Sequence, residues 1–245
     1  MNLHVVNSGS VGNCYILAGE TSTLVIECGV SIRAIKQALN FQVARVAGVL
    51  VSHEHLDHCK AAEDVLAAGM DIYCSAGTWQ AMGIQSHRIR TVKHGMRYQI
   101  GEFTVMPFNV KHDCLEPLGF VIQHPECGRV LFVTDSYYVP SRFPGLNNIL
   151  VEANYCNKIV EARVEAGRLH GFLRDRVLES HMSIDTCEQL LLSNDLAAVQ
   201  NIVLLHLSDG NSNARQFQDR ITCATGKKVF IAEKNLTIPF NKTAF

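Results

Sequence analysis

The stretch that decides the fold reads Val49-Leu50-Val51-Ser52-His53-Glu54-His55-Leu56-Asp57-His58. It joins an apolar run to the pattern H-x-H-x-D-H. In an extended segment, His53 and His55 project to the same side, whereas Asp57 and His58 follow where the chain turns into a helix. Leaving these side chains unpaired at the end of a buried strand would carry a desolvation cost, and metal ions satisfy all of them together. The pattern predicts a metal site, with an exposed polar loop as the weaker alternative.

The composition is that of a folded protein with no strong charge. Of 245 residues, 47% are hydrophobic and 18% charged, so wholesale disorder is excluded. The 22 basic and 23 acidic residues give a net charge of −1, which argues against a protein that coats nucleic acid through basicity but leaves a local patch open.

Two further patterns bear on location. No apolar run approaches the roughly 18 residues of a membrane span, and Met1–Val6 lacks the basic start of a secretory signal. The nine cysteines are scattered without a C-x-x-C pair, which is typical of reduced thiols rather than of a zinc knuckle. We expect a soluble, cytoplasmic protein that does not bind a membrane.

The order of elements predicts one α/β domain over residues 1–245. Short apolar strands alternate with helical stretches, first strands and then helices, and the order then repeats. This arrangement favours an αββα sandwich of two sheets with helices outside. Strands are expected near 3–6, 14–17, 23–27, 47–52, 71–74, 90–92, 103–108, 118–123, 129–134 and 201–205, and helices near 31–39, 60–68, 158–178, 185–194 and 213–225. Further β runs close the chain after the last helix.

The H-x-H-x-D-H string resembles the motif of the metallo-β-lactamase-fold superfamily, which lies at the end of a core strand. The resemblance implies two central mixed sheets and a site for two divalent metal ions, completed by a His, an Asp and a His from later loops. Three residues fall in that order after apolar runs: His112 after 106–111, Asp135 after 130–134 and His206 after 202–205.

The assignment that the resemblance implies divides seven ligands between two metals. One metal would take His53, His55 and His112, the other would take Asp57, His58 and His206, and Asp135 would bridge them. Nitrogen-rich ligands with carboxylates suit zinc, although manganese or iron would fit too.

Several later motifs resemble one branch of the superfamily, the YycJ (WalJ) type, which is related to ribonuclease Z. The segments are Ser8-Gly9-Ser10-Val11-Gly12-Asn13 (S-G-S-x-G-N), Thr134-Asp135-Ser136 (T-D-T/S), Glu152-Ala153-Asn154 (E-x-N), Arg174-Asp175-Arg176-Val177-Leu178 followed by Ser180-His181-Met182-Ser183 (R-x-R-I/L and G-H-L-S), and His206-Leu207-Ser208 (H-L-S). The resemblance covers most of the chain in order.

This branch implies hydrolysis of phosphodiester bonds in nucleic acid or in small or cyclic nucleotides by a hydroxide bound to both metals. Asp57 and His181 are the predicted catalytic residues, with His181 protonating the leaving group. The alternative for His181 is a surface residue after a helix. A non-phosphate hydrolase (lactonase or thioesterase) on the same metals remains the alternative function, and a non-catalytic metal-binding module is a third. A homodimer is possible, as in relatives.

The predicted substrate contacts are Ser8, Ser10, Asn154 and His181. The glycine-containing loop at 8–13 could offer N–H groups and hydroxyls to a phosphate, or could simply be a tight hairpin. The arginines at 168, 174 and 176 could contact phosphates, but acidic neighbours favour a solvated helix. A Cys59 nucleophile beside His58 is disfavoured, because no free base remains for it.

Two departures from the family pattern affect the site. Glu27 stands where most relatives carry Asp after the third strand, so the loop must adjust to one extra methylene. Ser180 stands where glycine is usual before His181, and Ile184 replaces an Asn, which leaves the shape of the substrate pocket open.

Overall fold

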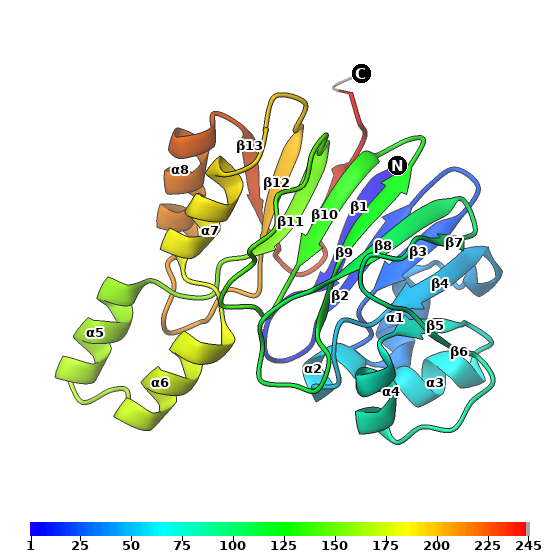
Figure 1. Ribbon diagram of the computed structural model, residues 1–245, viewed down its shortest axis with the longest axis horizontal. Coiled ribbons are helices and arrows are strands. Elements are labelled where there is room, and N and C mark those ends of the chain that lie inside the picture. Colours follow the sequence, from blue (N-terminus) through cyan, green and yellow to red (C-terminus); the bar gives the residue numbers. More distant parts are fainter. Residues whose placement is uncertain (244–245) are drawn as a thin grey trace.

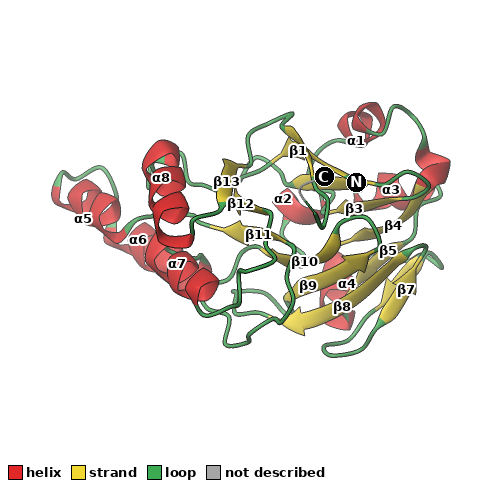
Figure 2. Cartoon of the chain, turned by 90° about the horizontal axis from the view of Figure 1, so that it is seen from above, coloured by secondary structure: helices red, strands yellow, loops and turns green. Residues whose placement is uncertain are grey.

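Two seven-stranded β-sheets face each other at the centre of the molecule, with helices on the outer faces (Figure 1; Figure 2). The coordinates are a computed structural model, and the structure describes residues 1–243. The predicted αββα sandwich of two mixed sheets is confirmed.

The first sheet is built mainly from the N-terminal half of the chain. Its order is β14-β1-β2-β3-β4-β5-β6, antiparallel from β14 to β3 and parallel from β3 to β6. The strands are β1 (Asn2–Asn7), β2 (Cys14–Ala18), β3 (Thr23–Ile26), β4 (Val46–Leu50), β5 (Ile72–Cys74), β6 (Ile89–Thr91) and β14 (Thr237–Pro239).

The second sheet is built from the later half of the chain and has the same mixed character. Its order is β13-β12-β11-β10-β9-β8-β7, antiparallel from β7 to β10 and parallel from β10 to β13. The strands are β7 (Tyr98–Ile100), β8 (Phe103–Asn109), β9 (Leu118–His124), β10 (Gly128–Val133), β11 (Asn148–Glu152), β12 (Asn201–Leu205) and β13 (Lys228–Ile231).

The helices divide between the two outer faces. Beside the first sheet lie α1 (Ile32–Ala38), α2 (Leu56–Cys59), α3 (Ala62–Ala67), α4 (Ala76–Met82) and a short 3-10 turn at Val43–Arg45; on the other side lie α5 (Asn157–Glu165), α6 (Gly171–Ser180), α7 (Ile184–Leu192) and α8 (Ala214–Thr225). Among residues 1–243, no helix combines the length and apolar character that crossing a bilayer requires.

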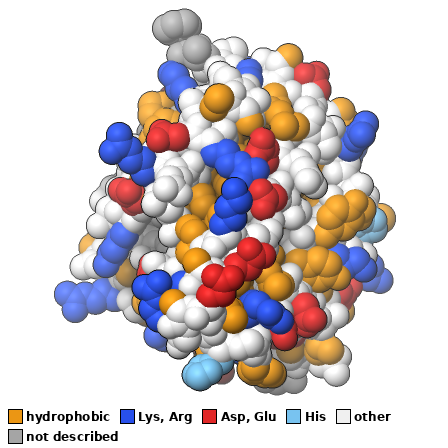
Figure 3. Space-filling model, turned by 90° about the vertical axis from the view of Figure 1, so that its left-hand side faces the viewer, with side chains coloured by type: hydrophobic (Ala, Val, Ile, Leu, Met, Phe, Trp, Pro, Cys, Tyr) orange, Lys and Arg blue, Asp and Glu red, His pale blue; other side chains and the backbone are white. Residues whose placement is uncertain are grey.

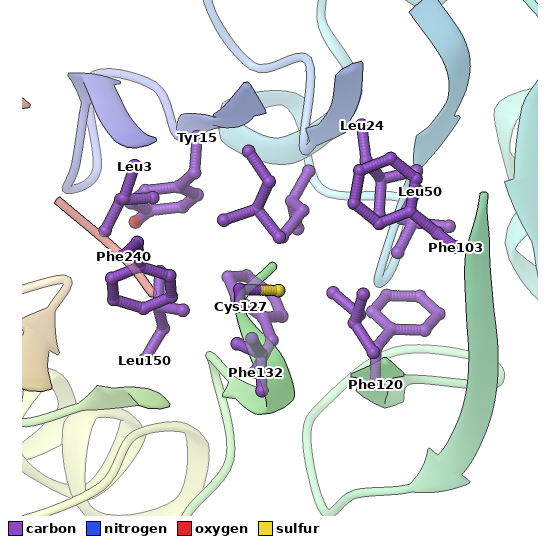
Figure 4. Close-up of a cluster of buried hydrophobic side chains, with 14 of the residues drawn as sticks. Leu3, Tyr15, Leu24, Leu50, Phe103, Phe120, Cys127, Phe132, Leu150 and Phe240 are labelled. Atoms are coloured by element: carbon purple, nitrogen blue, oxygen red, sulfur yellow. The ribbon is translucent and has the colours of Figure 1, made fainter. Parts of the chain in front are cut away.

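Three apolar clusters hold the layers together. The central cluster joins side chains from both sheets, and Figure 4 shows Leu3, Tyr15, Leu24 and Leu50 of the first sheet facing side chains of the second. The ring of Tyr15 meets that of Phe132 edge to face, with centroids 5.6 Å apart. A second cluster packs α7 and α8 on the second sheet, and a third packs α1 and α3 on the first. Strands covered on both faces explain the unbroken apolar runs in the sequence.

One predicted helix is wrong in extent. Residues 158–178 do not form one helix, because α5 ends at Glu165 and α6 begins at Gly171. Gly167 has a φ of +67°, a left-handed conformation that ends a helix, and His170 is extended. Figure 1 shows α5 and α6 standing out from the body of the molecule below α7. Three further elements, β7, β11 and α4, were not predicted from the sequence.

The parallel strands position the chemistry. In each sheet, neighbouring parallel strands end at the same edge, and the polar residues follow directly after these ends. β4 leads into residues 51–58, β10 into Asp135, β11 into Asn154 and β12 into His206.

Candidate metal centre and active site

The seven predicted metal ligands lie together in two overlapping groups. Each group offers four ligand atoms that all lie within 4.8 Å of one another. The first group consists of His53, His55, His112 and Asp135, and the second of Asp57, His58, Asp135 and His206. Asp135 is common to both groups.

In the first group, imidazole nitrogens surround one carboxylate oxygen. The Nε2 atoms of His53 and His112 each lie 3.7 Å from Asp135 Oδ2. The Nε2 atom of His112 lies 3.1 Å from His55 Nδ1. His112 comes from the loop after β8, three residues beyond the end of the strand, and not from the strand itself.

In the second group, two imidazoles lie between two carboxylates. The Nε2 atom of His58 is 3.2 Å from Asp135 Oδ2 and 3.4 Å from Asp57 Oδ2. The Nε2 atom of His206 is 3.3 Å from Asp57 Oδ2 and 3.8 Å from Asp135 Oδ1. Asp135 therefore turns one oxygen toward His58 and the other toward His206.

The backbone at this edge is bent sharply. Glu27, Asp135 and His206, which follow β3, β10 and β12, have φ values of 65°, 42° and 53°. Side chains other than glycine adopt this left-handed region at a cost of about 1–3 kcal/mol each, and such residues cluster at functional sites. The turn lets the chain leave the strand while the side chain stays at the sheet edge.

These side chains fit a metal ion. His53 is 1% exposed, and its Nε2 atom has no hydrogen-bond partner although it faces the Asp135 carboxylate. A buried polar atom without a partner is costly, and a cation between these groups would satisfy it. Imidazole nitrogens and carboxylate oxygens are the donors that zinc takes in proteins.

The side chains of the cluster change one another's pKa values. Burial alone would raise the pKa of Asp57, but hydrogen bonds from His206 and His58 outweigh it and hold that pKa far below its usual range. Burial lowers the pKa of His53 well below its ordinary value, which favours the neutral ring, the form in which an imidazole can bind a metal ion. For His58, burial is outweighed by Asp135 and Glu27, which raise its pKa. The carboxylates of Asp57 and Asp135 both lie within 3.4 Å of His58 Nε2, so a positive charge between them would be stabilised.

A buried glutamate supports the second group from behind. Glu27 is fully buried, accepts a hydrogen bond from the Ser52 N–H at 3.2 Å, and lies 3.5 Å from His58 Nδ1. A carboxylate behind a metal-binding imidazole fixes its orientation and raises its basicity. Glu27 reaches both partners from a backbone in the left-handed conformation, with a φ of 65°.

His181 has a similar partner that the sequence reading did not place in the site. Its Nδ1 atom lies 2.7 Å from Oε1 of Glu152, which is fully buried at the end of β11. The other oxygen of Glu152 accepts hydrogen bonds from the N–H groups of Ser136 and Met182, so this carboxylate ties together the loops of Asp135 and His181. The sequence does carry a signal for Glu152: it is an acidic residue directly after the apolar run at 149–151. Asp135 was predicted as a ligand from the same kind of pattern.

The environment of His181 favours its protonated form. Burial lowers its pKa, but the Glu152 carboxylate outweighs that effect and raises the pKa to about 9. The ring stacks on that of His206 with centroids 5.2 Å apart, and its side chain is 21% exposed. His181 thus lies beside the second ligand group and keeps access to solvent.

Besides His181, which pairs with Glu152, two of the four predicted substrate contacts have protein partners. The Ser8 hydroxyl lies 2.7 Å from the Tyr15 hydroxyl and accepts a hydrogen bond from the His206 N–H at 2.9 Å. The Asn154 side-chain amide donates to the His206 carbonyl at 2.8 Å. Both residues position His206, whereas Ser10 is exposed and lines the pocket above the ligands.

The ligands and His181 open into a pocket of about 170 Å³. It is lined by Ser10, His55, Asp57, His112, Asp113, Asp135, Arg176, Ser180, His181 and His206. Arg176 is the only Lys or Arg among these residues. A larger groove of about 920 Å³ lies on the outer side of β1 beside α1 and contains none of the seven ligand candidates.

Comparisons with known proteins agree with this geometry. The model of the β-lactamase superfamily domain matches residues 22–207. The exodeoxyribonuclease WalJ of Streptococcus pneumoniae is 28% identical over 226 residues, which cover 85% of this chain and 82% of that protein. The exodeoxyribonuclease YycJ of Bacillus anthracis is 29% identical over 234 residues, covering 86% of this chain and 85% of that protein.

The fold is also found among solved structures. The metallo-β-lactamase-fold protein YhfI from Bacillus subtilis matches with a TM-score of 0.75, at 15% identity, over 97% of this chain and 98% of that chain. The family match spans more than half of the sequence, and all seven ligand candidates lie within the matched residues 22–207. The chain therefore belongs to the β-lactamase superfamily and has the metallo-β-lactamase fold.

Proposed function

We propose that this protein is a metal-dependent phosphodiesterase of the nuclease type, acting on DNA. The observation that carries the proposal is His181, which lies beside the ligand groups with its Nδ1 atom 2.7 Å from buried Glu152. The two similar exodeoxyribonucleases support DNA as the substrate.

The proposal includes two divalent ions, of which zinc suits the donor set best. His53, His55 and His112 would hold one, and Asp57, His58 and His206 the other, with Asp135 between them. When bound, such ions lower the pKa of a water molecule and stabilise negative charge on phosphate oxygens. Five imidazoles with two carboxylates are typical of zinc, although manganese would also bind.

Two residues that line the pocket, His181 and Asp57, would handle the protons of the reaction. Because the Nδ1 atom of His181 is engaged by Glu152, its Nε2 atom is left to donate a proton to the departing oxygen. The raised pKa of His181, about 9, keeps this proton in place at neutral pH. Asp57 lines the same pocket, where its carboxylate can accept a hydrogen bond from the attacking water.

Phosphodiester cleavage needs this arrangement more than lactone hydrolysis does. A poor alkoxide leaving group has to be protonated, and the doubly substituted phosphate carries a negative charge that a protonated imidazole offsets. A lactone or thioester presents no such charge to His181. The non-phosphate hydrolase is therefore the weaker candidate.

A substrate panel tests the proposal. The purified chain, stripped with a chelator and reloaded with Zn²⁺ or Mn²⁺, is assayed on single- and double-stranded DNA, RNA, a cyclic mononucleotide, bis(p-nitrophenyl) phosphate and a lactone. We expect phosphodiester hydrolysis that the chelator abolishes and metal restores, with DNA among the substrates. Hydrolysis of the lactone alone would refute the proposal.

A further inference from the structure

The α6 helix leads from the pocket outward, and its side chains change character along one face. Phe172, Arg176 and Ser180 are spaced four residues apart, so they lie on the same side of the helix. Ser180 is buried and lines the pocket, Arg176 also lines it, and Phe172 lies one turn further out with 80% of its side chain exposed.

Arg176 is a cation without a partner. Among residues 1–243 its side chain makes no hydrogen bond or ion pair, whereas Arg174 on the same helix binds Asp175 at 2.6 Å. Because Arg176 lines the pocket, an anion next to the reacting phosphate would be within reach of its long side chain. Guanidinium groups bind phosphate through two parallel hydrogen bonds.

Phe172 is an exposed aromatic ring at the free end of the same helix. The α5–α6 hairpin extends away from the sheets in both views (Figure 1; Figure 2), and Ser180 is the only buried residue of α6. Leu173 beside it is also exposed. An aromatic face in this position is open to an unpaired base, and such stacking is tolerant of sequence.

The distances along α6 match a nucleic-acid strand. With a rise of 1.5 Å per residue, Arg176 lies about 6 Å and Phe172 about 12 Å along the axis from Ser180, the residue before His181. A stacked strand advances about 3.4 Å per nucleotide. These spacings correspond to about two and about four nucleotides from the cleaved bond.

The charge distribution favours one strand over a duplex. Figure 3 shows that Lys and Arg side chains are interspersed with Asp and Glu on the face of the molecule that it presents, without a continuous basic tract. The net charge of −1 agrees with this. Duplex binding depends on many phosphate contacts, whereas one arginine and one aromatic ring suit a single strand with accessible bases.

We propose that α6 binds single-stranded DNA, with Arg176 on a phosphate about two nucleotides from the cleaved bond and Phe172 stacked on a base about four nucleotides away. This inference rests on the proposed phosphodiesterase function and specifies its substrate. It adds a positioning element outside the metal ligands and His181.

The test measures KM with thymidine oligonucleotides of two to ten nucleotides on the full chain loaded with Zn²⁺. For the wild-type protein, KM should fall until the oligonucleotide reaches about four to five nucleotides. Arg176→Ala should raise KM of the ten-nucleotide substrate about tenfold and reduce the slope of log KM against log salt by about 0.7. Phe172→Ala should also raise that KM about tenfold and flatten the dependence on length.

Matched controls remove the same groups elsewhere. Arg33 on α1 is an exposed arginine, and Phe41 is 70% exposed after the same helix. Neither residue lines the pocket. Arg33→Ala and Phe41→Ala should keep the wild-type KM and length dependence.

The outcomes separate this inference from the function on which it rests. If the wild type cleaves the oligonucleotides but both α6 variants keep its KM and length dependence, the role of α6 is wrong and the function stands. Loss of dimer by Phe172→Ala in sedimentation velocity would overturn the inference and make α6 a contact between two copies. Failure to hydrolyse any phosphodiester, bis(p-nitrophenyl) phosphate included, would overturn the function and the inference together.

Discussion

Two buried glutamates, one at the edge of each sheet, lie behind the site in almost the same way. Glu27 follows β3 and Glu152 ends β11, and both are fully buried. Each accepts a hydrogen bond from the N–H of a serine just beyond the neighbouring parallel strand. This serine is Ser52, after β4, for Glu27 and Ser136, after β10, for Glu152. Each also faces the Nδ1 atom of a histidine.

The histidines that they face have different surroundings. His58 is fully buried, and its other nitrogen lies 3.2 Å from Asp135 and 3.4 Å from Asp57. His181 is 21% exposed and lines the pocket. The contact is also shorter for His181, 2.7 Å against 3.5 Å for His58.

We propose that the same pairing serves two purposes in this molecule. A buried carboxylate orients an imidazole and increases its affinity for a cation or a proton. In His58, the Nε2 atom lies next to the carboxylates of Asp57 and Asp135, so this imidazole is suited to binding a metal ion. Where the ring borders an open pocket, the same pairing favours a proton donor.

The strongest test removes the carboxylate that both ligand groups share. Asp135→Ala should lower turnover of bis(p-nitrophenyl) phosphate at least about 10³-fold and remove at least one metal, because several kcal/mol of charge stabilisation depend on the bound ions. Elemental analysis and initial rates measure the two effects. Asp219→Ala, at an exposed position on α8, is the control and should keep both. Wild-type metal content and turnover in Asp135→Ala would show that this carboxylate is not a shared ligand.

The next test separates the two histidines. His58→Ala should lose metal together with turnover. His181→Ala should keep the metal content and lose turnover by about 10²–10⁴-fold, as expected for a missing general acid. The loss for His181→Ala should be smaller with p-nitrophenolate, a good leaving group, than with an alkoxide. Equal losses with both leaving groups would instead assign His181 to substrate positioning.

A smaller effect is expected when each glutamate loses only its charge. Glu27→Gln should weaken metal binding about 10–100-fold, measured by competition with a chromophoric chelator. Glu152→Gln should change metal affinity less, since its carboxylate lies 3.8 Å from His206 Nδ1 but 2.7 Å from His181. Equal losses of metal affinity in the two variants would remove the distinction between them.

Glu152→Gln should also shift the pH dependence of kcat/KM. Burial lowers the pKa of His181 and the Glu152 carboxylate raises it to about 9, so removing the charge lets the pKa fall. The protonated imidazole is then lost at a lower pH, and the alkaline limb of the profile moves toward neutrality. An alkaline limb at the wild-type pH would mean that another group donates the proton.

The smallest expected effects are on the free energy of unfolding, when a methyl group is added at Gly29 or at Gly210. A Cβ at Gly29, two residues after Glu27, would lie 1.7 Å from the Asp57 carbonyl oxygen, which is backbone and cannot yield easily. Gly29→Ala should therefore lower the free energy of unfolding by about 1–3 kcal/mol in urea titrations. A Cβ at Gly210 would meet the end of the Arg163 side chain, which can move, so Gly210→Ala should cost about 0.5 kcal/mol or less. The reverse order would contradict this account of the packing.

Much of the fold and the ligand set could be predicted from the chain alone. The H-x-H-x-D-H string and the apolar runs before Asp135 and His206 are local patterns, and a strand covered on both faces must be apolar throughout. Such patterns identify which residues end a strand. The resemblance that they carried to the superfamily is confirmed. The roles of the individual site residues stay predictions.

Other features depended on tertiary structure. The helical spacing at 158–178 did not reveal the break between α5 and α6. A glycine can also occur inside a helix, and only the structure shows that Gly167 has a left-handed φ that ends one. Ser8 and Asn154 have donors and acceptors that could serve a substrate, but the fold turns them toward His206. Arg176 lay among acidic neighbours in the sequence, and only the path of α6 brings it to the pocket without an anionic partner.

The pairing of Glu152 with His181 illustrates the physical reason for this division. Periodicity and strand-end chemistry depend on neighbours within a few residues, so the sequence by itself determined the layers, the strand ends and the seven ligand candidates. The partners of a buried side chain are chosen by elements far apart in the chain, and β11 meets the loop after α6 only when the second sheet is assembled. Tertiary structure therefore decided which carboxylate faces which imidazole, because a buried charge must be matched in space and not in sequence.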